Sequence, residues 1–330
     1  MSSSLSPRNA ARGARRPARH RFATTAVPAL LTATLLAAAA CGSSEGGDGG
    51  GDRAGAPSSA SQDGQGTIDG GSISTTAMGD LGSLNSGSAA GLGSGSAAAR
   101  ATGEVEVVRD LPHDPAAFTQ GLEFHDGRLY ESTGEYGTSW VSAKQLDAPA
   151  TDYEFKTDSL PREQFGEGMT FVGNSLWQLT WKDGVAYQRD AATGEETDRA
   201  DYEGEGWGLC NLGDRLAMSD GSNKITFRDP ETFAPTGSVD VAQDGRPIDQ
   251  LNELECAGGK IYANVWMSDT IVRIDPATGA VDAAWDLHDI GQPRPSDPNA
   301  VLNGIAAVPD SDTFVVTGKL WPGAYEVRLK

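Results

Sequence analysis

A short pattern with a polar residue at its centre recurs five times between residues 118 and 305. The central residues are 47, 38, 47 and 51 positions apart; they are Gln120, Glu167, Glu205, Asn252 and Asn303. A period of roughly 40 to 50 residues is typical of the four-stranded blade of a β-propeller. If the five residues are equivalent, closed symmetry gathers their side chains into one ring.

Hairpin signals follow the pattern. In four copies, two short apolar stretches flank a tight turn; these turns are His125-Asp126-Gly127, Gly173-Asn174, Gly213-Asp214 and Gly258-Gly259. A second set of turns, rich in Asp, Pro and Gly, lies at residues 189–194, 229–232 and 275–279. No helical period of comparable strength is present. The sequence therefore predicts an all-β fold.

The fifth repeat is one strand short, because residues 325–329 end the chain. An unpaired strand edge promotes aggregation, and the early strand at residues 104–108 can complete this repeat and close the ring. We therefore expect a five-bladed β-propeller over residues 104–330. A six-bladed ring with one degenerate blade is the alternative.

The N-terminal segment has the features of a bacterial export signal. Residues 1–40 contain six arginines and no Asp or Glu, and an apolar stretch ends at Ala38-Ala39-Ala40, directly before Cys41. The pattern resembles a lipoprotein signal in which Cys41 becomes the lipidated N-terminus. Cleavage by an ordinary signal peptidase, with an incidental cysteine, is the alternative. We expect an exported lipoprotein that is held at the cell membrane by its lipid anchor alone.

Residues 41–103 connect this anchor to the predicted propeller. They are dominated by Gly, Ser and Ala, and such a segment buries too little apolar surface to offset its ordering entropy. We expect a disordered tether.

Loss of the six arginines of the signal takes the formal net charge from −20 to about −26. Such an acidic protein is a poor partner for nucleic acid, whose phosphates require Lys and Arg. We expect a monomer.

Cys210 and Cys256 are the two cysteines of the predicted propeller, and each follows a copy of the pattern. Export permits a disulfide between them, but two buried thiols fit the sequence equally well. The four His are scattered, and no Cys/His spacing fits a metal site. We expect neither a metal nor a cofactor.

Strand order predicts where a functional site forms. In a blade, the first strand starts at the face to which the second strand returns, so one mouth of the channel collects Glu167, Trp181, Trp207, Trp266 and Lys319. A carboxyl group among indoles is desolvated, which suits general acid/base catalysis. An ammonium group can stabilise an oxyanion. Taken singly, each of these residues is more often structural, and their convergence on one mouth favours a reaction site.

Ten ordered motifs resemble the plant-latex type of glutamine cyclotransferase, across nearly all of residues 104–330. Among them are Phe118-Thr119-Gln120-Gly121-Leu122, Gly166-Glu167-Gly168-Met169-Thr170, Tyr262-Ala263-Asn264-Val265-Trp266 and Thr317-Gly318-Lys319-Leu320-Trp321-Pro322. The resemblance implies a five-bladed propeller that converts N-terminal Gln of peptides and proteins to pyroglutamate and releases ammonia without a catalytic metal.

The resemblance also implies the roles of individual residues. Glu167 is the expected general acid/base, with Lys319 as its catalytic partner. The residues expected around the substrate are Phe118, Gln120, Phe165, Trp181, Trp207, Asn252 and Trp266. Glu205 also lies in a Gly-Glu-Gly sequence, so symmetry alone does not choose between the two glutamates. The competing class is a non-catalytic secreted propeller that binds peptides or sugars, which the fold alone does not exclude.

Overall fold

The computed structural model describes residues 98–330 apart from residue 159. These residues belong to one compact unit. The predicted signal, Cys41 and the predicted tether up to residue 97 lie outside the described residues. Within them there is no helix, so none that is long and apolar enough to cross a membrane.

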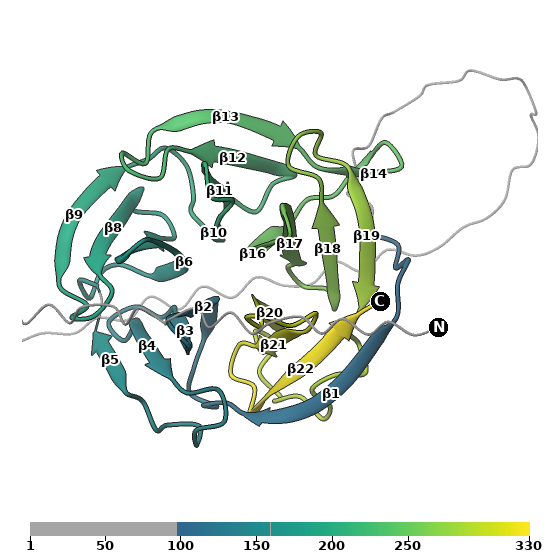
Figure 1. Cartoon of the computed structure of the whole chain (residues 1–330), viewed down its shortest axis with the longest axis horizontal. Helices are drawn as coiled ribbons and strands as arrows, with labels where there is room; N and C mark the ends of the chain where they lie inside the picture. The colour runs from purple at the N-terminus through teal and green to yellow at the C-terminus, as the bar shows by residue number, and fades with distance from the viewer. Residues whose placement is uncertain (1–97, 159) are drawn as a thin grey trace, which may run out of the picture. The chain divides into compact units, whose positions relative to one another are not determined.

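Five antiparallel sheets of four strands each are arranged around a central axis (Figure 1). This confirms the predicted five-bladed propeller, and the six-bladed alternative is wrong. Blade 1 contains β2 (Thr119–His125), β3 (Arg128–Thr133), β4 (Trp140–Lys144) and β5 (Phe155–Asp158). Blade 2 contains β6 (Gly166–Val172), β7 (Ser175–Thr180), β8 (Val185–Asp190) and β9 (Glu196–Asp201). Blade 3 contains β10 (Leu209–Asn211), β11 (Leu216–Ser219), β12 (Lys224–Arg228) and β13 (Pro235–Asp240).

Blades 4 and 5 complete the ring. Blade 4 contains β16 (Leu251–Ala257), β17 (Lys260–Val265), β18 (Thr270–Ile274) and β19 (Val281–Asp286). Blade 5 contains β20 (Leu302–Ala307), β21 (Phe314–Gly318), β22 (Gly323–Leu329) and β1 (Val105–Pro112). A short hairpin of β14 (Ala242–Gln243) and β15 (Arg246–Pro247) lies between blades 3 and 4 in the sequence.

The ring is closed by the N-terminal strand, as predicted. β1 pairs antiparallel with β22, from Val105 opposite Leu329 to Pro112 opposite Gly323 (Figure 1). Residues assigned to the tether from sequence also contact the propeller. The backbone N–H of Arg100 donates to Oε1 of Gln243 at 2.7 Å, and the N–H of Thr102 donates to the carbonyl of Ala284 at 2.7 Å.

The turns follow from local chemistry. The first hairpin of blade 1 turns at Asp126 and Gly127, which both have positive φ (45° and 75°), as a two-residue type I′ turn requires. At the turn between β8 and β9 of blade 2, Oδ1 of Asp190 accepts the backbone N–H groups of Ala192 and Thr193. Asp229 and Asp275 repeat this arrangement in blades 3 and 4. The Asp-containing turns of the sequence therefore end three outer hairpins.

The hydrophobic core lies between the blades. Five buried clusters each join residues from two neighbouring blades. Between blades 2 and 3, for example, the rings of Trp177 and Phe233 lie 4.9 Å apart. Burial of such apolar surface contributes roughly 25 cal/mol per Å², so each blade depends on both neighbours for its stability.

Blades 3 and 4 are also joined covalently. Cys210 of β10 and Cys256 of β16 form a disulfide, with their Cα atoms 5.4 Å apart. The sequence left a bridge and two free thiols equally open. Both cysteines lie on the innermost strands of adjacent blades, which brings residues 46 positions apart in the sequence into contact.

Three glutamates lie on the innermost strands β2 and β16: Glu253 and Glu255 are buried, and Glu123 is half-buried. The carboxylate of Glu253 accepts the backbone N–H of Leu122 at 3.2 Å and that of Ile305 at 2.8 Å, so it links blade 4 to blades 1 and 5. Burial raises the pKa of Glu253 well above its usual range. Burial likewise raises the pKa of Glu123 to about 7, and burial together with Glu123 and Glu253 raises that of Glu255.

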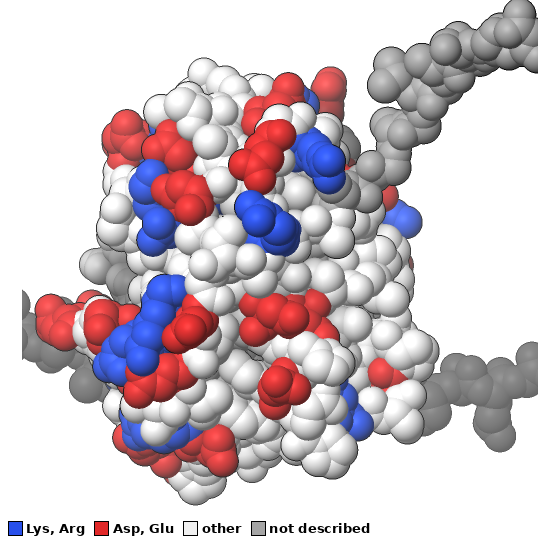
Figure 2. All heavy atoms as spheres, turned by 90° about the vertical axis from the view of Figure 1, so that its right-hand side faces the viewer, with Lys and Arg blue, Asp and Glu red and all other residues white. Residues whose placement is uncertain are grey.

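The outer strands face solvent and carry paired charges. On blade 4, the ammonium of Lys260 lies 2.8 Å from Asp275 and 2.9 Å from Asp282, and Arg273 binds Asp282 at 2.6 Å. Figure 2 views the side of the ring that carries β19, and it shows acidic and basic side chains next to each other on this surface. Although acidic residues outnumber basic ones in the chain, this side of the ring carries charges of both signs next to each other.

Candidate active site

The innermost strands carry irregularities where the sequence pattern recurs. Register shifts interrupt β2 between Thr119 and Gly121, β6 between Gly166 and Met169, β16 between Leu251 and Leu254, and β20 between Leu302 and Ile305. The residues inside these shifts include Gln120, Glu167, Asn252 and Asn303. A β-bulge redirects side chains, so these four polar residues share one structural position in their blades.

The equivalence of Glu205 with Glu167 is wrong. In blade 2, Met169 pairs with Gln178, two residues before the end of β7. In blade 3 the corresponding pair is Leu209 with Met218, because Leu209 precedes the hairpin turn at Gly213 by four residues, as Met169 precedes the turn at Gly173. Counting back by two residues places Trp207, and not Glu205, at the position of Glu167. The next residue, Gly208, corresponds to Gly168: a Cβ on Gly208 would lie 2.1 Å from the carbonyl oxygen of Asn252, and one on Gly168 would lie 2.6 Å from that of Trp207, so close packing of neighbouring blades excludes a side chain at this position.

The ends of the second strands supply the other side of the mouth. Trp181, Trp266 and Lys319 each directly follow the last residue of β7, β17 and β21. The next residue in two of these blades has a positive φ, 59° at Met267 and 62° at Leu320. The backbone thus leaves the sheet abruptly after Trp266 and Lys319, which keeps both residues at the mouth of the channel.

A cavity of about 250 Å³ opens at this mouth. All nine residues predicted for the site line it; they are Phe118, Gln120, Phe165, Glu167, Trp181, Trp207, Asn252, Trp266 and Lys319. Asn299 also lines the cavity and was missed from sequence. It lies in the irregular loop between β19 and β20, outside the repeated pattern, so no periodic signal marks it.

Aromatic rings form most of the wall. The ring of Phe165 contacts those of Phe118 and Trp181, with centroids 5.9 and 5.7 Å apart, and Trp207 contacts Trp266 at 5.6 Å. Outside this wall, the exposed ring of Tyr136 packs on Phe165 at 5.3 Å. The cavity therefore offers an apolar environment that is continuous across four blades.

Glu205 joins the two halves of the aromatic wall. Its Oε2 accepts the indole N–H of Trp181 at 2.8 Å and that of Trp207 at 3.0 Å. Its side chain is 40% exposed, and the ammonium of Lys182 lies 3.9 Å from its Oε1. Glu205 is thus placed to orient two walls of the cavity, whereas Glu167 lies inside it.

Glu167 is the buried carboxyl group of the cavity, with 4% of its surface exposed. Its Oε1 accepts a hydrogen bond from Nε2 of Gln120 at 3.1 Å, and Oε1 of Gln120 accepts one from Nδ2 of Asn303 at 3.1 Å. Burial raises the pKa of Glu167 well above its usual range; Lys319 opposes this shift and Glu205 adds to it. A carboxyl group whose pKa is raised in this way suits general acid/base catalysis.

Lys319 is the buried ammonium group of the cavity, 5% exposed. Its Nζ lies 4.7 Å from the centroid of the Phe118 ring. Burial lowers its pKa to about 8, although Glu167 and Glu135 favour its charge. Nearby, the buried Oδ1 of Asn252 has no hydrogen-bond partner among the described residues. The cavity thus combines a proton carrier, a cation and an open acceptor within aromatic walls.

Metal ligands were not expected from the sequence. Over residues 98–158 and 160–330, no group of three or more His, Cys, Asp or Glu side chains is arranged to hold a metal ion.

Comparison with known proteins gives the family. The model of the glutamine cyclotransferase family matches residues 81–329. This chain belongs to the glutamine cyclotransferase family. The glutaminyl-peptide cyclotransferase of Arabidopsis thaliana is 37% identical over 232 residues, which make up 69% of this chain and 72% of that protein. The crystal structure of Myxococcus xanthus glutaminyl cyclase matches with a TM-score of 0.65 and 39% identity, over 70% of this chain and 98% of that chain.

Membership of the glutamine cyclotransferase family confirms the resemblance seen in the sequence. The roles assigned to individual cavity residues stay predictions, because the comparisons give relatives and a fold but not the action of any side chain.

Proposed function

We propose that this protein is a glutaminyl-peptide cyclotransferase, which converts the N-terminal glutamine of peptides and proteins to pyroglutamate and releases ammonia. The observation that carries the proposal is a buried carboxyl group, Glu167, in the same aromatic cavity as the ammonium of Lys319, in a chain of this family. Relatives named for this activity support it.

In the proposed reaction, the α-amine of the substrate attacks the carbonyl carbon of its own side-chain amide. A carbon–nitrogen bond closes a five-membered ring, and the carbonyl oxygen becomes an oxyanion. Glu167 accepts a proton from the attacking nitrogen and delivers it to the amide nitrogen, so that the bond to this nitrogen breaks and ammonia leaves. Lys319 stabilises the oxyanion.

The remaining cavity residues hold the reactive conformer. The reaction is intramolecular, so the main requirement is that the substrate stays folded with its amine close to its amide. Oδ1 of Asn252 is free to accept an N–H of the substrate, and Gln120 holds the carboxyl group of Glu167 in place. The aromatic rings exclude water, which strengthens the electrostatic interactions inside.

The sequence supports a proposal for the location and the oligomeric state of the protein. We propose export, lipidation at Cys41 and attachment to the membrane through this lipid alone, with the propeller acting as a monomer on peptides outside the cytoplasm. Mass spectrometry of the mature protein tests the anchor: a diacylglyceryl-modified Cys41 is expected at its N-terminus, and an unmodified N-terminus at another position would contradict it.

Incubation of the full-length protein with a Gln-initiated dipeptide tests the activity. We expect ammonia and the matching pyroglutamyl product in equal amounts. A dipeptide with an acetylated α-amine is the control and should not react, because its nitrogen is no longer a nucleophile. A protein that binds the dipeptide without releasing ammonia would instead be the non-catalytic binding propeller.

A further inference from the structure

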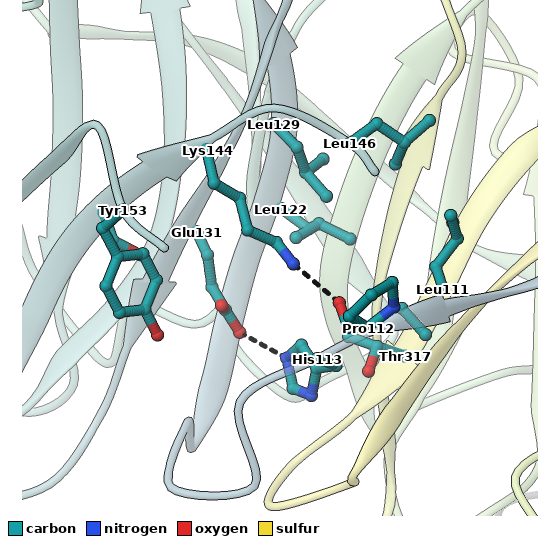
Figure 3. Close-up of a pocket in the computed structure, with 12 residues that line it drawn as sticks. Leu111, Pro112, His113, Leu122, Leu129, Glu131, Lys144, Leu146, Tyr153 and Thr317 are labelled. Carbon is teal, nitrogen blue, oxygen red and sulfur yellow. Dashed lines mark hydrogen bonds and ion pairs between the residues drawn. The ribbon is translucent and has the colours of Figure 1, made fainter. Parts of the chain in front are cut away.

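A second buried polar cluster lies between blades 1 and 5, centred on His113. It borders a cavity of about 10 Å³, which has room for no more than about one water molecule. None of the residues that line this small cavity lines the large one. Figure 3 shows the imidazole of His113 pointing to the carboxylate of Glu131, and the ammonium of Lys144 pointing to the carbonyl oxygen of Pro112.

The hydrogen bonds of His113 define its protonation. Its Nδ1 lies 2.6 Å from the carbonyl oxygen of Trp321, and its Nε2 lies 2.9 Å from Oε1 of Glu131. A carbonyl oxygen and a carboxylate oxygen are both acceptors, so each ring nitrogen has to donate. His113 is therefore an imidazolium ion that is 4% exposed.

The surrounding charges agree with this assignment. Burial opposes the charge of His113, but the carboxylate of Glu131 and the carbonyl of Trp321 outweigh burial and raise the pKa of His113; the ammonium of Lys144 acts in the opposite direction. The nearby carboxylate of Asp114 is engaged by the hydroxyl group of Tyr153 at 2.7 Å.

The partners of His113 lead directly to the catalytic cavity. Trp321 follows Lys319 by two residues, in the turn that contains the positive φ of Leu320. On the other side, Oε1 of Glu131 accepts the hydroxyl group of Thr119 at 2.7 Å. Thr119 lies between Phe118 and Gln120, which both line the cavity.

Two backbone contacts complete this connection between the blades. The N–H of Leu320 donates to the carbonyl of Ala117 at 2.7 Å. The indole N–H of Trp321 donates to the carbonyl of Ala300 at 3.0 Å, beside Asn299 of the cavity wall. The turn that carries Lys319 is thus held against Ala117, which precedes β2 of blade 1, and against the loop that carries Asn299.

We propose that His113 is a positioning residue for the cyclisation. As an imidazolium ion it binds the turn of Lys319 on blade 5 to Glu131 and Thr119 on blade 1, and so sets the position of the ammonium of Lys319 relative to the substrate oxyanion. This inference rests on the proposed function. It assigns His113 no contact with the substrate and no part in proton transfer.

Substitution His113→Gln tests the proposal, because glutamine keeps a hydrogen-bond donor but has no charge. We expect kcat for a Gln dipeptide to fall about tenfold to a hundredfold, as a displacement of about 1 Å can cause, with KM changed less than about twofold. Glu326→Gln is the matched control. It also removes the charge of a buried group, a carboxylate that accepts hydrogen bonds from Thr313 and Arg109 and lines neither cavity, and it should leave kcat unchanged.

A second readout follows Lys319 itself. The ¹⁵N NMR titration of its Nζ should give a pKa near 8 in the wild type and in Glu326→Gln. In His113→Gln the pKa should rise towards the ordinary lysine value, because the loosened turn exposes the ammonium to water. A merely stabilising role for His113 would lower the unfolding temperature without moving either this pKa or kcat.

Several outcomes would overturn the proposal. One is a folded His113→Gln variant with wild-type kcat and an unchanged Lys319 pKa. If that variant does not fold, Glu131→Gln takes its place with the same expectations. The ¹⁵N signals of the wild-type imidazole provide a test without any variant: a neutral ring at pH 7 contradicts the proposal. If the wild type releases no ammonia, the proposed function fails. The titrations of the imidazole and of Lys319 then still test whether charged His113 fixes the position of the Lys319 turn.

Discussion

At the scale of single residues, the two glutamates of the Gly-Glu-Gly sequences have different positions and should have different roles. Glu167→Gln should lose roughly two to four orders of magnitude in kcat, the usual contribution of a general acid/base, and should keep its fold and KM. Glu205→Gln should mainly raise KM, because the amide replaces a carboxylate that holds two indole N–H groups. Steady-state kinetics on both variants check this. An inactive, well-folded Glu205→Gln beside a normal Glu167→Gln would reverse the assignment.

The residues also show what could be predicted from sequence. Nine cavity residues were found because the strand order of a blade fixes which strand ends meet, and because the family motifs name the same positions. The alignment of Glu205 failed because the true equivalent is Trp207, an aromatic residue at a position that is polar in the other four blades. Asn299 was missed because its loop has no repeat.

At the scale of elements, the disulfide between β10 and β16 should stabilise the ring. Its two cysteines are 46 residues apart, and cross-linking a loop of that length removes about 4 kcal/mol of chain entropy from the unfolded state. The double variant Cys210→Ser/Cys256→Ser should lose a similar amount of its free energy of unfolding. Urea denaturation measures this loss as a lower midpoint concentration. Reductant should weaken the wild type and leave the double variant unchanged. Equal stability with and without the bridge would show that the packing of the two blades suffices.

The glutamates of β2 and β16 should make stability fall as the pH rises. The pKa of Glu123 is raised from 4.5 to about 7 by burial, so the folded state keeps a proton that the unfolded state releases. This contribution is complete below pH 4.5 and is lost as the pH passes through 7. Groups with lowered pKa, such as Asp275 at about 2, act only at more acidic pH.

Urea denaturation from pH 5 to pH 8 measures this effect. We expect a falling midpoint in the wild type and a flatter profile in Glu123→Gln, which has no charge to bury. Glu195→Gln, on an exposed turn, is the control and should follow the wild type. A wild-type midpoint that rises over this range would contradict the account. The sequence did not predict this cluster, because it depends on the register of β2 against β16 and not on any repeated pattern.

At the scale of the whole molecule, the number of blades was predictable because the repeat length fixes one blade per copy. Ring closure was predictable because the last blade lacked a strand and the chain contained one spare. The first residue of the folded part was less well marked in the sequence than the number of blades. Residues 100–103 belong by composition to the Gly/Ser/Ala-rich segment, yet they bind blade 4 and its neighbouring hairpin through backbone groups, which composition does not reveal.

The closing strand should determine whether the ring forms at all. β1 provides the fourth strand of blade 5 and covers the edge of β22 over seven paired positions. A chain that begins at Pro112 would leave this edge free to pair with other molecules. We expect it to associate in size-exclusion chromatography and to unfold at a lower temperature. A chain that begins at Ala98, the first residue that the structure describes, keeps β1 and should behave as a stable monomer. If the shorter chain is equally stable and monomeric, blade 5 needs only three strands, and closure by the N-terminal strand is dispensable.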